Sequence, residues 1–318
     1  MPIDPKSLGE AAGVWAALKT DAATKLVEVV AAGAGKVYEP FHRRRLAKAD
    51  AAALVEMAKG KAEAQEIELR AVERLLSIAA RRQENIEAIV ESARAQLPGE
   101  ASSEPVDPDW AARYFDACQD VSDNDMRERW GKLLAREVTE PRSFSLRTLA
   151  VFGHMTRAEA ELFERLCAGS LRRGKHLFPM IFDLQNDALA AIGLGTFEDI
   201  QALVDAGLIS LTSLVLPADQ TSSKGVGFDA GEMGVLWAKP PEQMNPLGLE
   251  KFGLSDFSKE ISLGAIALTP TGRQLAVLTA WSPSQARVDA AALGLQRIRH
   301  TVVVESVEPK SQGPSEAA

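Results

Sequence analysis

Apolar positions recur in sevens from Leu69 to Leu97, within a stretch that contains no proline between Pro40 and Pro98. The spacing between successive apolar positions alternates three and four, which is typical of a coiled-coil-like seam. Gln83 is a polar residue within this series, and such a residue can fix the register or the number of partner helices. We therefore expect antiparallel helix pairing or self-association here, with a break into a hairpin near Gly60. The predicted seam comprises Leu69, Val72, Leu76, Ala79, Gln83, Ile86, Val90 and Leu97.

Helical periodicity continues after the Pro, Gly and Ser-rich stretch at residues 97–110. Asp107 followed by Pro108 predicts a helix start, and Ser122 with Asp125 resembles a capping box for the next helix. In that next helix we expect Trp130 to anchor the core. Further caps are predicted at Ser145, before a helix with Leu146, Leu149 and Phe152 on its buried side, and at Thr156 with Glu159.

The pattern changes from helical to mixed beyond Gly174. HLFPMIF, SLTSLVL, ISLGAIAL and TVVVESV read as short strands, while TFEDIQALVDAG, LTPTGRQLAVLTA and residues 284–298 read as helices. The order of these elements resembles a winged-helix arrangement. It consists of a helix, a strand, a polar insertion at residues 217–259, a second strand and a Pro-led helix.

These elements predict a mainly α protein with a C-terminal α+β domain. We expect an N-terminal helical and coiled-coil region at residues 1–97, a helical domain at 98–174, a winged-helix-like domain at 175–307 and a disordered tail at 308–318.

The composition is that of a soluble globular protein, with 46% hydrophobic and 25% charged residues. The net charge of −8 makes a large nucleic-acid footprint unexpected. Two cysteines, Cys118 and Cys167, on apolar helical faces indicate a reducing compartment, and the N-terminus lacks the pattern of a signal peptide. We expect a cytoplasmic protein. For residues 20–40, a buried helix is the preferred interpretation, and peripheral contact with a membrane surface stays the alternative.

Several segments together resemble an uncharacterised bacterial family, the domain of unknown function 2806. The segments are RRRLAKADAAA, RAVERLLSIAARRQENIEAI, DPDWAARYFDACQDVSDNDMRERWGKLLAREVTEPRSFSLRTL and EAELFERLC. The resemblance covers roughly Val37 to Cys167 and extends more loosely to Leu278. The central part is also similar to abortive-infection alpha proteins, which implies a bacterial conflict or phage-defence setting. Arg136, Glu137 and Val138 depart from the Gly, Glu and Ala run expected at this point.

Metal and nucleotide chemistry find little support in the sequence. His42, His154, His176 and His300 form no metal-ligand spacing with one another or with cysteine, so no zinc site is predicted. AGAGKVY lacks the first glycine and the final Ser or Thr of a phosphate-binding loop, and no cofactor is predicted.

Three other groups of charged residues are open to a functional interpretation. Arg147 and His154 fit the loose pattern of HEPN-type ribonucleases, in which the arginine would stabilise phosphate charge and the histidine would assist proton transfer. A basic ridge for anionic lipid or nucleic acid would comprise Arg43, Arg44, Arg45, Arg81 and Arg82. Nearby acids favour a solvated helix face instead. Asp123, Asp125 and Glu128 resemble a cation site, but helix-start electrostatics explains them.

The preferred hypothesis is a non-catalytic oligomeric scaffold or interaction protein. It would self-associate through residues 43–97 and contact an unknown protein partner through the C-terminal domain. The alternatives are the ribonuclease centred on Arg147 and His154 and a winged-helix nucleic-acid-binding regulator. The expected recognition helix, TFEDIQALVDA, carries acids and no basic residue, which argues against DNA.

Overall fold

The chain divides into two compact units, residues 1–154 and residues 155–318. The computed structural model describes residues 21–33, 66–98, 100–217, 225–239 and 260–305. The predicted boundary at residue 97 falls inside the first unit, and the boundary at residue 174 falls inside the second. Gly60, Arg43, Arg44, Arg45 and the expected tail at 308–318 lie outside the described residues.

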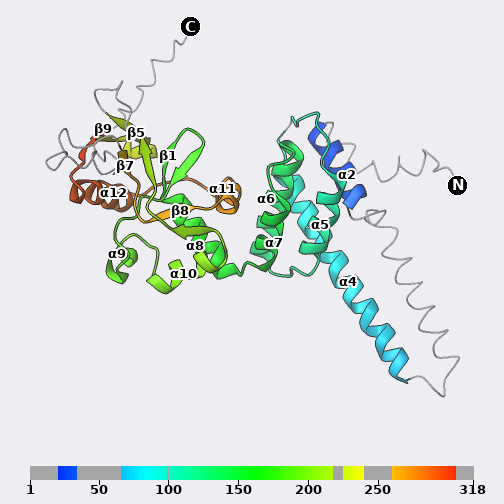
Figure 1. The fold of residues 1–318 in the computed structure, drawn as a ribbon. Coiled ribbons are helices and arrows are strands. Elements are labelled where there is room, and N and C mark those ends of the chain that lie inside the picture. Colours follow the sequence, from blue (N-terminus) through cyan, green and yellow to red (C-terminus); the bar gives the residue numbers. More distant parts are fainter. Residues whose placement is uncertain (1–20, 34–65, 99, 218–224, 240–259, 306–318) are drawn as a thin grey trace, which may run out of the picture. The chain divides into compact units, whose positions relative to one another are not determined.

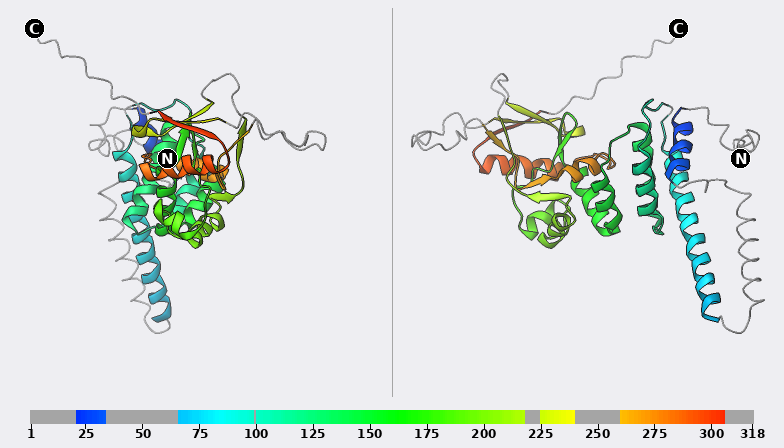
Figure 2. Two further views of the ribbon diagram at one scale, coloured as in Figure 1. Left: turned by 90° about the vertical axis from the view of Figure 1, so that its left-hand side faces the viewer. Right: turned by 45° about the vertical axis from the view of Figure 1, so that its right-hand side comes forward.

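The described part of the first unit is helical (Figure 1). α4 packs against α6, while α2 and α7 pack against α5, so helices on both sides of residue 97 share one core. Because of this shared core, the chain does not divide into separate units at residue 97. α4 also runs well past the other described helices of the unit (Figure 2). The helices are α2 (Asp21–Gly33), α4 (Glu66–Ala95), α5 (Pro108–Cys118), α6 (Asn124–Thr139) and α7 (Leu146–His154).

Side-chain caps fix where these helices begin. The Asp107 carboxylate accepts hydrogen bonds from the backbone N–H groups of residues 109 and 110, which confirms the predicted start of α5. The start of α6 was predicted one residue too early: Asp123, and not Ser122, is the N-cap and accepts from the Met126 N–H at 2.9 Å. Ser145 Oγ accepts from the Thr148 N–H at 3.2 Å, as expected.

A cluster of aromatic rings in stacked, edge-to-face and tilted pairs lies at the centre of the first unit. The ring of Tyr114 lies 5.2 Å from those of Trp110 and Trp130, and Trp130 lies 4.7 Å from Phe152. The Tyr114 hydroxyl donates to the Trp130 carbonyl at 2.7 Å. Trp130 is fully buried, so its predicted role as a core anchor is confirmed. Leu146 was wrongly assigned to the buried side of α7, because it is 44% exposed.

The second unit combines helices with short antiparallel strands (Figure 1). Five strands form one sheet in the order β2-β1-β5-β6-β9, and two further pairs are β3-β8 and β4-β7. The helices are α8 (Arg157–Ala168), α9 (Asn186–Ala191), α10 (Phe197–Asp205), α11 (Pro270–Ala276) and α12 (Gln285–Arg297). The strands are β1 (Leu171–Arg173), β2 (His176–Phe178), β3 (Ile209–Leu211), β4 (Val215–Pro217), β5 (Val226–Asp229), β6 (Val235–Lys239), β7 (Glu260–Ser262), β8 (Ile266–Leu268) and β9 (Thr301–Glu305), with a 3-10 turn at Gly231–Met233.

Capping boxes at Thr156 and at Thr196 start α8 and α10. The first of these boxes was predicted with Glu159, and the second starts the helix predicted at TFEDIQALVDAG. ISLGAIAL, expected as one strand, is divided into β7 and β8 at Gly264, whose φ is +98°. A Cβ at this glycine would lie 2.4 Å from the Ile181 carbonyl oxygen, so only glycine allows this close approach.

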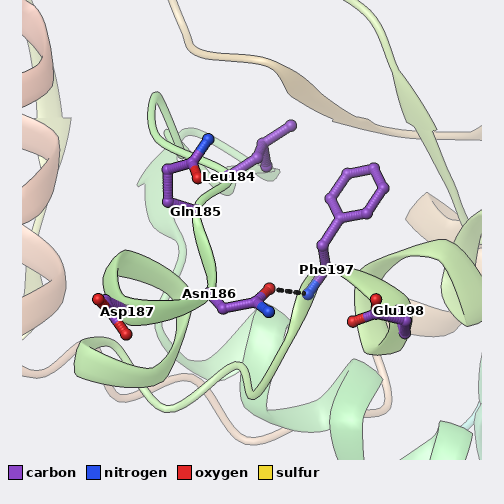
Figure 3. Close-up of a pocket in the computed structure, with 6 residues that line it drawn as sticks. All are labelled: Leu184, Gln185, Asn186, Asp187, Phe197 and Glu198. Carbon is purple, nitrogen blue, oxygen red and sulfur yellow. Dashed lines mark hydrogen bonds between the residues drawn. The ribbon is translucent and has the colours of Figure 1, made fainter.

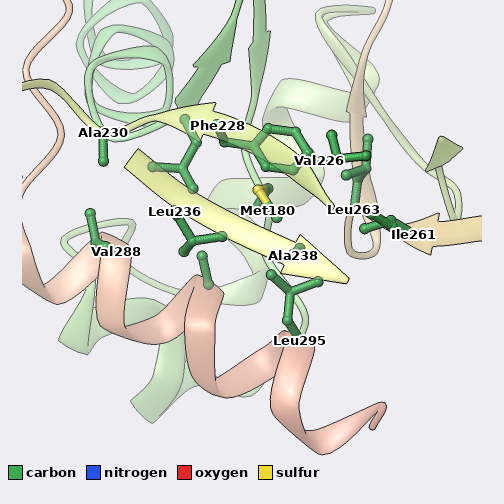
Figure 4. Close-up of a cluster of buried hydrophobic side chains, with 12 residues drawn as sticks. Met180, Val226, Phe228, Ala230, Leu236, Ala238, Ile261, Leu263, Val288 and Leu295 are labelled. Carbon is green, nitrogen blue, oxygen red and sulfur yellow. The ribbon is translucent and has the colours of Figure 1, made fainter. Parts of the chain in front are cut away.

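The segment at residues 217–259, expected only as a polar insertion, contains β5 and β6. These strands join β1 and β9 into the five-stranded sheet, which the sequence pattern did not predict. α12 lies along the sheet and directs Val288 and Leu295 toward Leu236 and Ala238 of β6 (Figure 4). All four side chains are fully buried.

Within the described part of the chain, no helix has both the length and the apolar character required to cross a membrane. In the segment with the membrane-surface alternative, residues 21–33 form α2, whose apolar face packs against α5 and α6. Leu26, Val29 and Val30 of this face are at most 4% exposed. Residues 34–40 lie outside the described part.

Candidate interaction surface

α4 has two halves with different surroundings. Its 30 residues give it a length of about 45 Å. The buried residues, Asn85, Ile86, Ile89, Val90 and Ala93, all lie in the C-terminal half, where α4 packs against α6. The predicted seam positions Ile86 and Val90 therefore serve the core of the first unit.

The junction between the two halves is fixed by a buried amide. Asn85 Nδ2 donates to the Gln119 carbonyl at 2.7 Å, and its Oδ1 accepts from Arg127 of α6. Because Asn85 is fully buried, these partners satisfy polar groups that would otherwise be costly. The network thereby holds α4 to the end of α5 and to α6.

No residue of α4 before Asn85 is buried. Leu69, Val72 and Leu76 of the seam are only half-buried, and Ala79 is exposed. Ile67 is 75% exposed and Leu75 is 62% exposed, so apolar surface extends beyond the seam. The N-terminal half of α4, residues 66–84, thus presents an amphipathic surface that we call the α4 seam half.

The remaining two seam positions are Gln83, near the end of the α4 seam half, and Leu97, just after the end of α4. Gln83 Nε2 donates to Glu87 Oε1 at 2.9 Å, one helical turn away. Leu97 follows the end of α4 and is half-buried. A role of the eight seam residues in contact with another chain stays a prediction.

Arg81 and Arg82 converge on one carboxylate. Arg82 donates to both oxygens of Asp120, at 3.0 and 2.7 Å, and Arg81 Nη2 lies 2.9 Å from the same group. The hydrogen bond from Arg82 lowers the pKa of the Asp120 carboxyl. Asp120 therefore compensates part of the positive charge that an external anion would bind, which weakens the basic-ridge interpretation.

Arg147 and His154 both lie on α7 and are both exposed. A separation of seven residues, two helical turns, places them on the same side of the helix. His154 Nδ1 lies 2.7 Å from the Ala150 carbonyl oxygen. The opposite side of α7 buries Thr148, Leu149 and Phe152. The two side chains can therefore meet a ligand at the surface.

The acids at the start of α6 have partners in the helix itself. Asp123 is the N-cap, and Glu128 Oε1 lies 3.0 Å from the Lys132 ammonium one turn later. Among the described residues, no group of three or more His, Cys, Asp and Glu side chains is arranged to hold a metal ion.

Sequence reasoning missed two buried charges in the first unit. Glu137 is 1% exposed, and its carboxylate accepts from the N–H groups of Arg142 at 2.6 Å and Phe144 at 3.1 Å. Burial raises the pKa of Glu137, against the opposing effect of these backbone hydrogen bonds. Lys25 of α2 donates to the Ser102 carbonyl at 2.8 Å, and burial lowers its pKa. Both groups hold loops in place.

Arg287, in the second unit, is a third buried charged residue that the sequence did not reveal. It is 5% exposed, and it donates to the Gly169 and Leu166 carbonyl groups at 3.0 and 3.1 Å. These carbonyls lie at the C-terminus of α8, where the helix dipole favours positive charge. Burial lowers the pKa of Arg287 to about 10. We interpret this arginine as a helix cap.

A polar depression lies between the starts of α9 and α10 (Figure 3). Asn186 Oδ1 accepts from the Phe197 N–H at 2.8 Å across it, and Asp187 and Glu198 lie at its rim. Its volume is about 500 Å³, and its other lining residues are Leu184 and Gln185. This set contains two carboxylates and no serine, cysteine, histidine, lysine or arginine.

Comparison with known proteins places most of these elements in one family. Residues 69–224 match the family model described as protein of unknown function (DUF2806). This part of the chain belongs to the DUF2806 family. The match begins within α4, so it leaves out RRRLAKADAAA, and it ends at residue 224, beyond Cys167 but short of Leu278. No curated protein and no solved structure matches the chain, and the expected similarity to abortive-infection alpha proteins is not shown.

Proposed function

We propose that this DUF2806 protein is a non-catalytic interaction protein that self-associates through the α4 seam half. The observation that carries the proposal is the contrast within α4, which buries residues only from Asn85 onward although its apolar pattern starts at Leu69. Pairing two such helices from two copies would remove this apolar surface from water, which is the driving force of coiled-coil association.

Sedimentation velocity of the full chain tests this proposal. We expect Leu69→Glu/Leu76→Glu to lower the mass relative to the wild type, because two charges would interrupt the seam. Ser77 is exposed and lies outside the seam, so Ser77→Glu is the matched control and should keep the wild-type mass. Equal masses for the wild type and the double variant, with circular dichroism showing both folded, would refute the proposal.

For the second unit, we propose a winged-helix-like arrangement that contacts a protein partner. The order of α8, α9, α10, β3, β8 and α11 supports this topology, while the five-stranded sheet is an addition to it. α10 carries Glu198, Asp199 and Asp205 and no basic side chain, which disfavours phosphate contacts. A nucleic-acid-binding regulator would instead show binding that weakens steeply with salt, and such binding would replace our proposal.

The ribonuclease alternative rests on the exposure of Arg147 and His154 on one side of α7. Its discriminating measurement is RNA cleavage by the purified chain, compared with His154→Ala. We expect no cleavage by either protein. Cleavage that the wild type performs and folded His154→Ala lacks would establish the enzyme and overturn the non-catalytic assignment.

The biological setting that we propose is phage defence, motivated by the similarity to abortive-infection alpha proteins that the sequence led us to expect for the central part. Phage plating on bacteria with and without the gene tests this setting. Reduced plaque formation that disappears in the seam variant would connect defence with self-association, whereas unchanged plating would remove phage defence from the proposal.

A further inference from the structure

β9 is an edge strand of the five-stranded sheet. It pairs with β6 in a continuous antiparallel register from Thr301 opposite Lys239 to Glu305 opposite Val235. No described strand pairs with its other side. The outer backbone groups of β9 are therefore a template for a further strand.

The position of β9 is fixed by the end of α12. Arg299 adopts a φ of +66°, and the N–H groups of residues 299 and 300 donate to the Gln296 and Leu295 carbonyls at 2.9 and 3.0 Å. This pair of hydrogen bonds is a Schellman motif, which ends the helix and directs the chain into the strand. Val302 then packs against the buried cluster beneath β6. The edge is ordered before any partner arrives, so pairing requires little additional ordering.

The side chains of β9 leave the edge apolar. Val303 is 55% exposed and Val304 is 44% exposed, on opposite faces of the strand. Edge strands usually carry lysine, proline or a bulge that discourages pairing. TVVVE contains no lysine or proline, and its register with β6 has no bulge.

We propose that β9 pairs antiparallel with β9 of a second copy of this chain, about a two-fold axis at Val303. In this register Val303 faces Val303 of the second copy, each Val302 faces a Val304, and each Thr301 faces a Glu305. Every apolar side chain meets an apolar one, and the carboxylate meets a hydroxyl. Parallel pairing in register would instead place the two Glu305 carboxylates side by side, and like charges at such positions are unfavourable.

The neighbouring strand supports this arrangement. Trp237 of β6 lies opposite Val303, and its Nε1 donates to Glu305 Oε2 at 2.9 Å. The Trp237 side chain also lies over Gly227 of β5, where a Cβ would come within 2.9 Å of the ring. One face of the sheet is therefore apolar from Val303 across Trp237 to Gly227. A second copy paired at β9 would extend this face.

A charge-exchange experiment on the full chain tests the register. Val303→Glu and Val303→Lys each place like charges opposite one another in the proposed pair, so each protein alone should lose this contact. Their equimolar mixture should form mixed pairs, because Glu then faces Lys. Native mass spectrometry distinguishes the mixed species from either protein alone.

We expect each single variant to show half the wild-type mass and the mixture to regain the wild-type mass. Val277, 52% exposed in the same unit, provides the control Val277→Glu, which should keep the wild-type mass. An unchanged mass for folded Val303→Glu, or a mixture without mixed pairs, would overturn the proposal. Because β9 and α4 are separate elements, this result is independent of the seam variants.

Discussion

Substitution of Gly131 by alanine tests the packing that positions α4. Gly131 lies in the interior of α6, where alanine would favour the helix by about 0.8–1.0 kcal/mol. A Cβ there would lie 2.5 Å from Ser92 Oγ, 2.7 Å from Ser92 Cβ and 2.9 Å from the backbone nitrogen of Ala93. The last contact is with main chain of α4, which cannot move away as a flexible side chain can.

Overpacking of this kind costs about 1–3 kcal/mol, which exceeds the gain in helix propensity. We therefore expect Gly131→Ala to destabilise the first unit by about 1 kcal/mol. Gly153 of α7 is the matched control, because its Cβ would meet the Ala117 Cβ at an ordinary 3.6 Å. Gly153→Ala should be neutral or stabilise the unit by about 0.5 kcal/mol.

Urea denaturation gives the stability of each variant, and hydrogen exchange of peptides from α4 and α6 assigns the change to the first unit. Faster exchange in both helices of Gly131→Ala and unchanged exchange in Gly153→Ala are the expected results. A Gly131→Ala protein as stable as Gly153→Ala would show that α4 and α6 do not require this close approach.

Three further substitutions test buried or strained groups, each by urea denaturation. Glu137→Ala should destabilise the first unit by about 2–4 kcal/mol, because the N–H groups of Arg142 and Phe144 lose their acceptor; a loss below 1 kcal/mol would contradict this. Burial raises the pKa of the Cys167 thiol to about 12, so its stabilising contribution is present below the unfolded pKa of about 8.5 and is lost as the pH rises toward 12. The free energy of unfolding of Cys167→Ala should therefore fall less than that of the wild type between pH 8.5 and 10.5. The same fall in both proteins would refute the burial of this thiol. Arg299→Gly should stabilise the second unit by about 0.5–1 kcal/mol, since glycine adopts φ of +66° without steric cost, and a loss of stability would indicate that the arginine side chain contributes.

Local rules predicted most helices of this chain. Asp107, Ser145 and Thr156 cap helices as expected, because capping depends only on neighbours three residues away. The error at Ser122 has the same local origin, since Asp123 next to it is an equally good cap and the sequence does not choose between them. Trp130 was also predicted correctly from helical spacing.

Features that depend on distant pairing escaped prediction. β5 and β6 lie in a polar insertion, and their partners β1 and β9 are far away in the sequence. The single strand expected at ISLGAIAL was divided because Gly264 meets Ile181, a contact that no local pattern encodes. Buried Arg287 was missed for the same reason, since its carbonyl partners lie 118 and 121 residues away in the sequence. Glu137 is a different case, because the backbone groups that it binds lie only five and seven residues further along the chain.

The candidate site was predictable only in part. The seam pattern from Leu69 to Leu97 is regular, but it does not indicate where intramolecular packing ends. That limit is set by α6, which covers α4 from Asn85 onward. Asp123 and Glu128 at the start of α6 and the arginine pair Arg81 and Arg82 have partners within the unit, and the partner of the arginines, Asp120, became evident only in the fold.

Sedimentation velocity in a Val303→Glu background tests the central claim most directly, because it separates the α4 seam half from the β9 edge. With the edge contact removed, association rests on α4 alone. We expect this protein to be a dimer and to become a monomer when Leu69→Glu/Leu76→Glu is added. A monomer before that addition, or a dimer that persists after it, would contradict self-association through the α4 seam half.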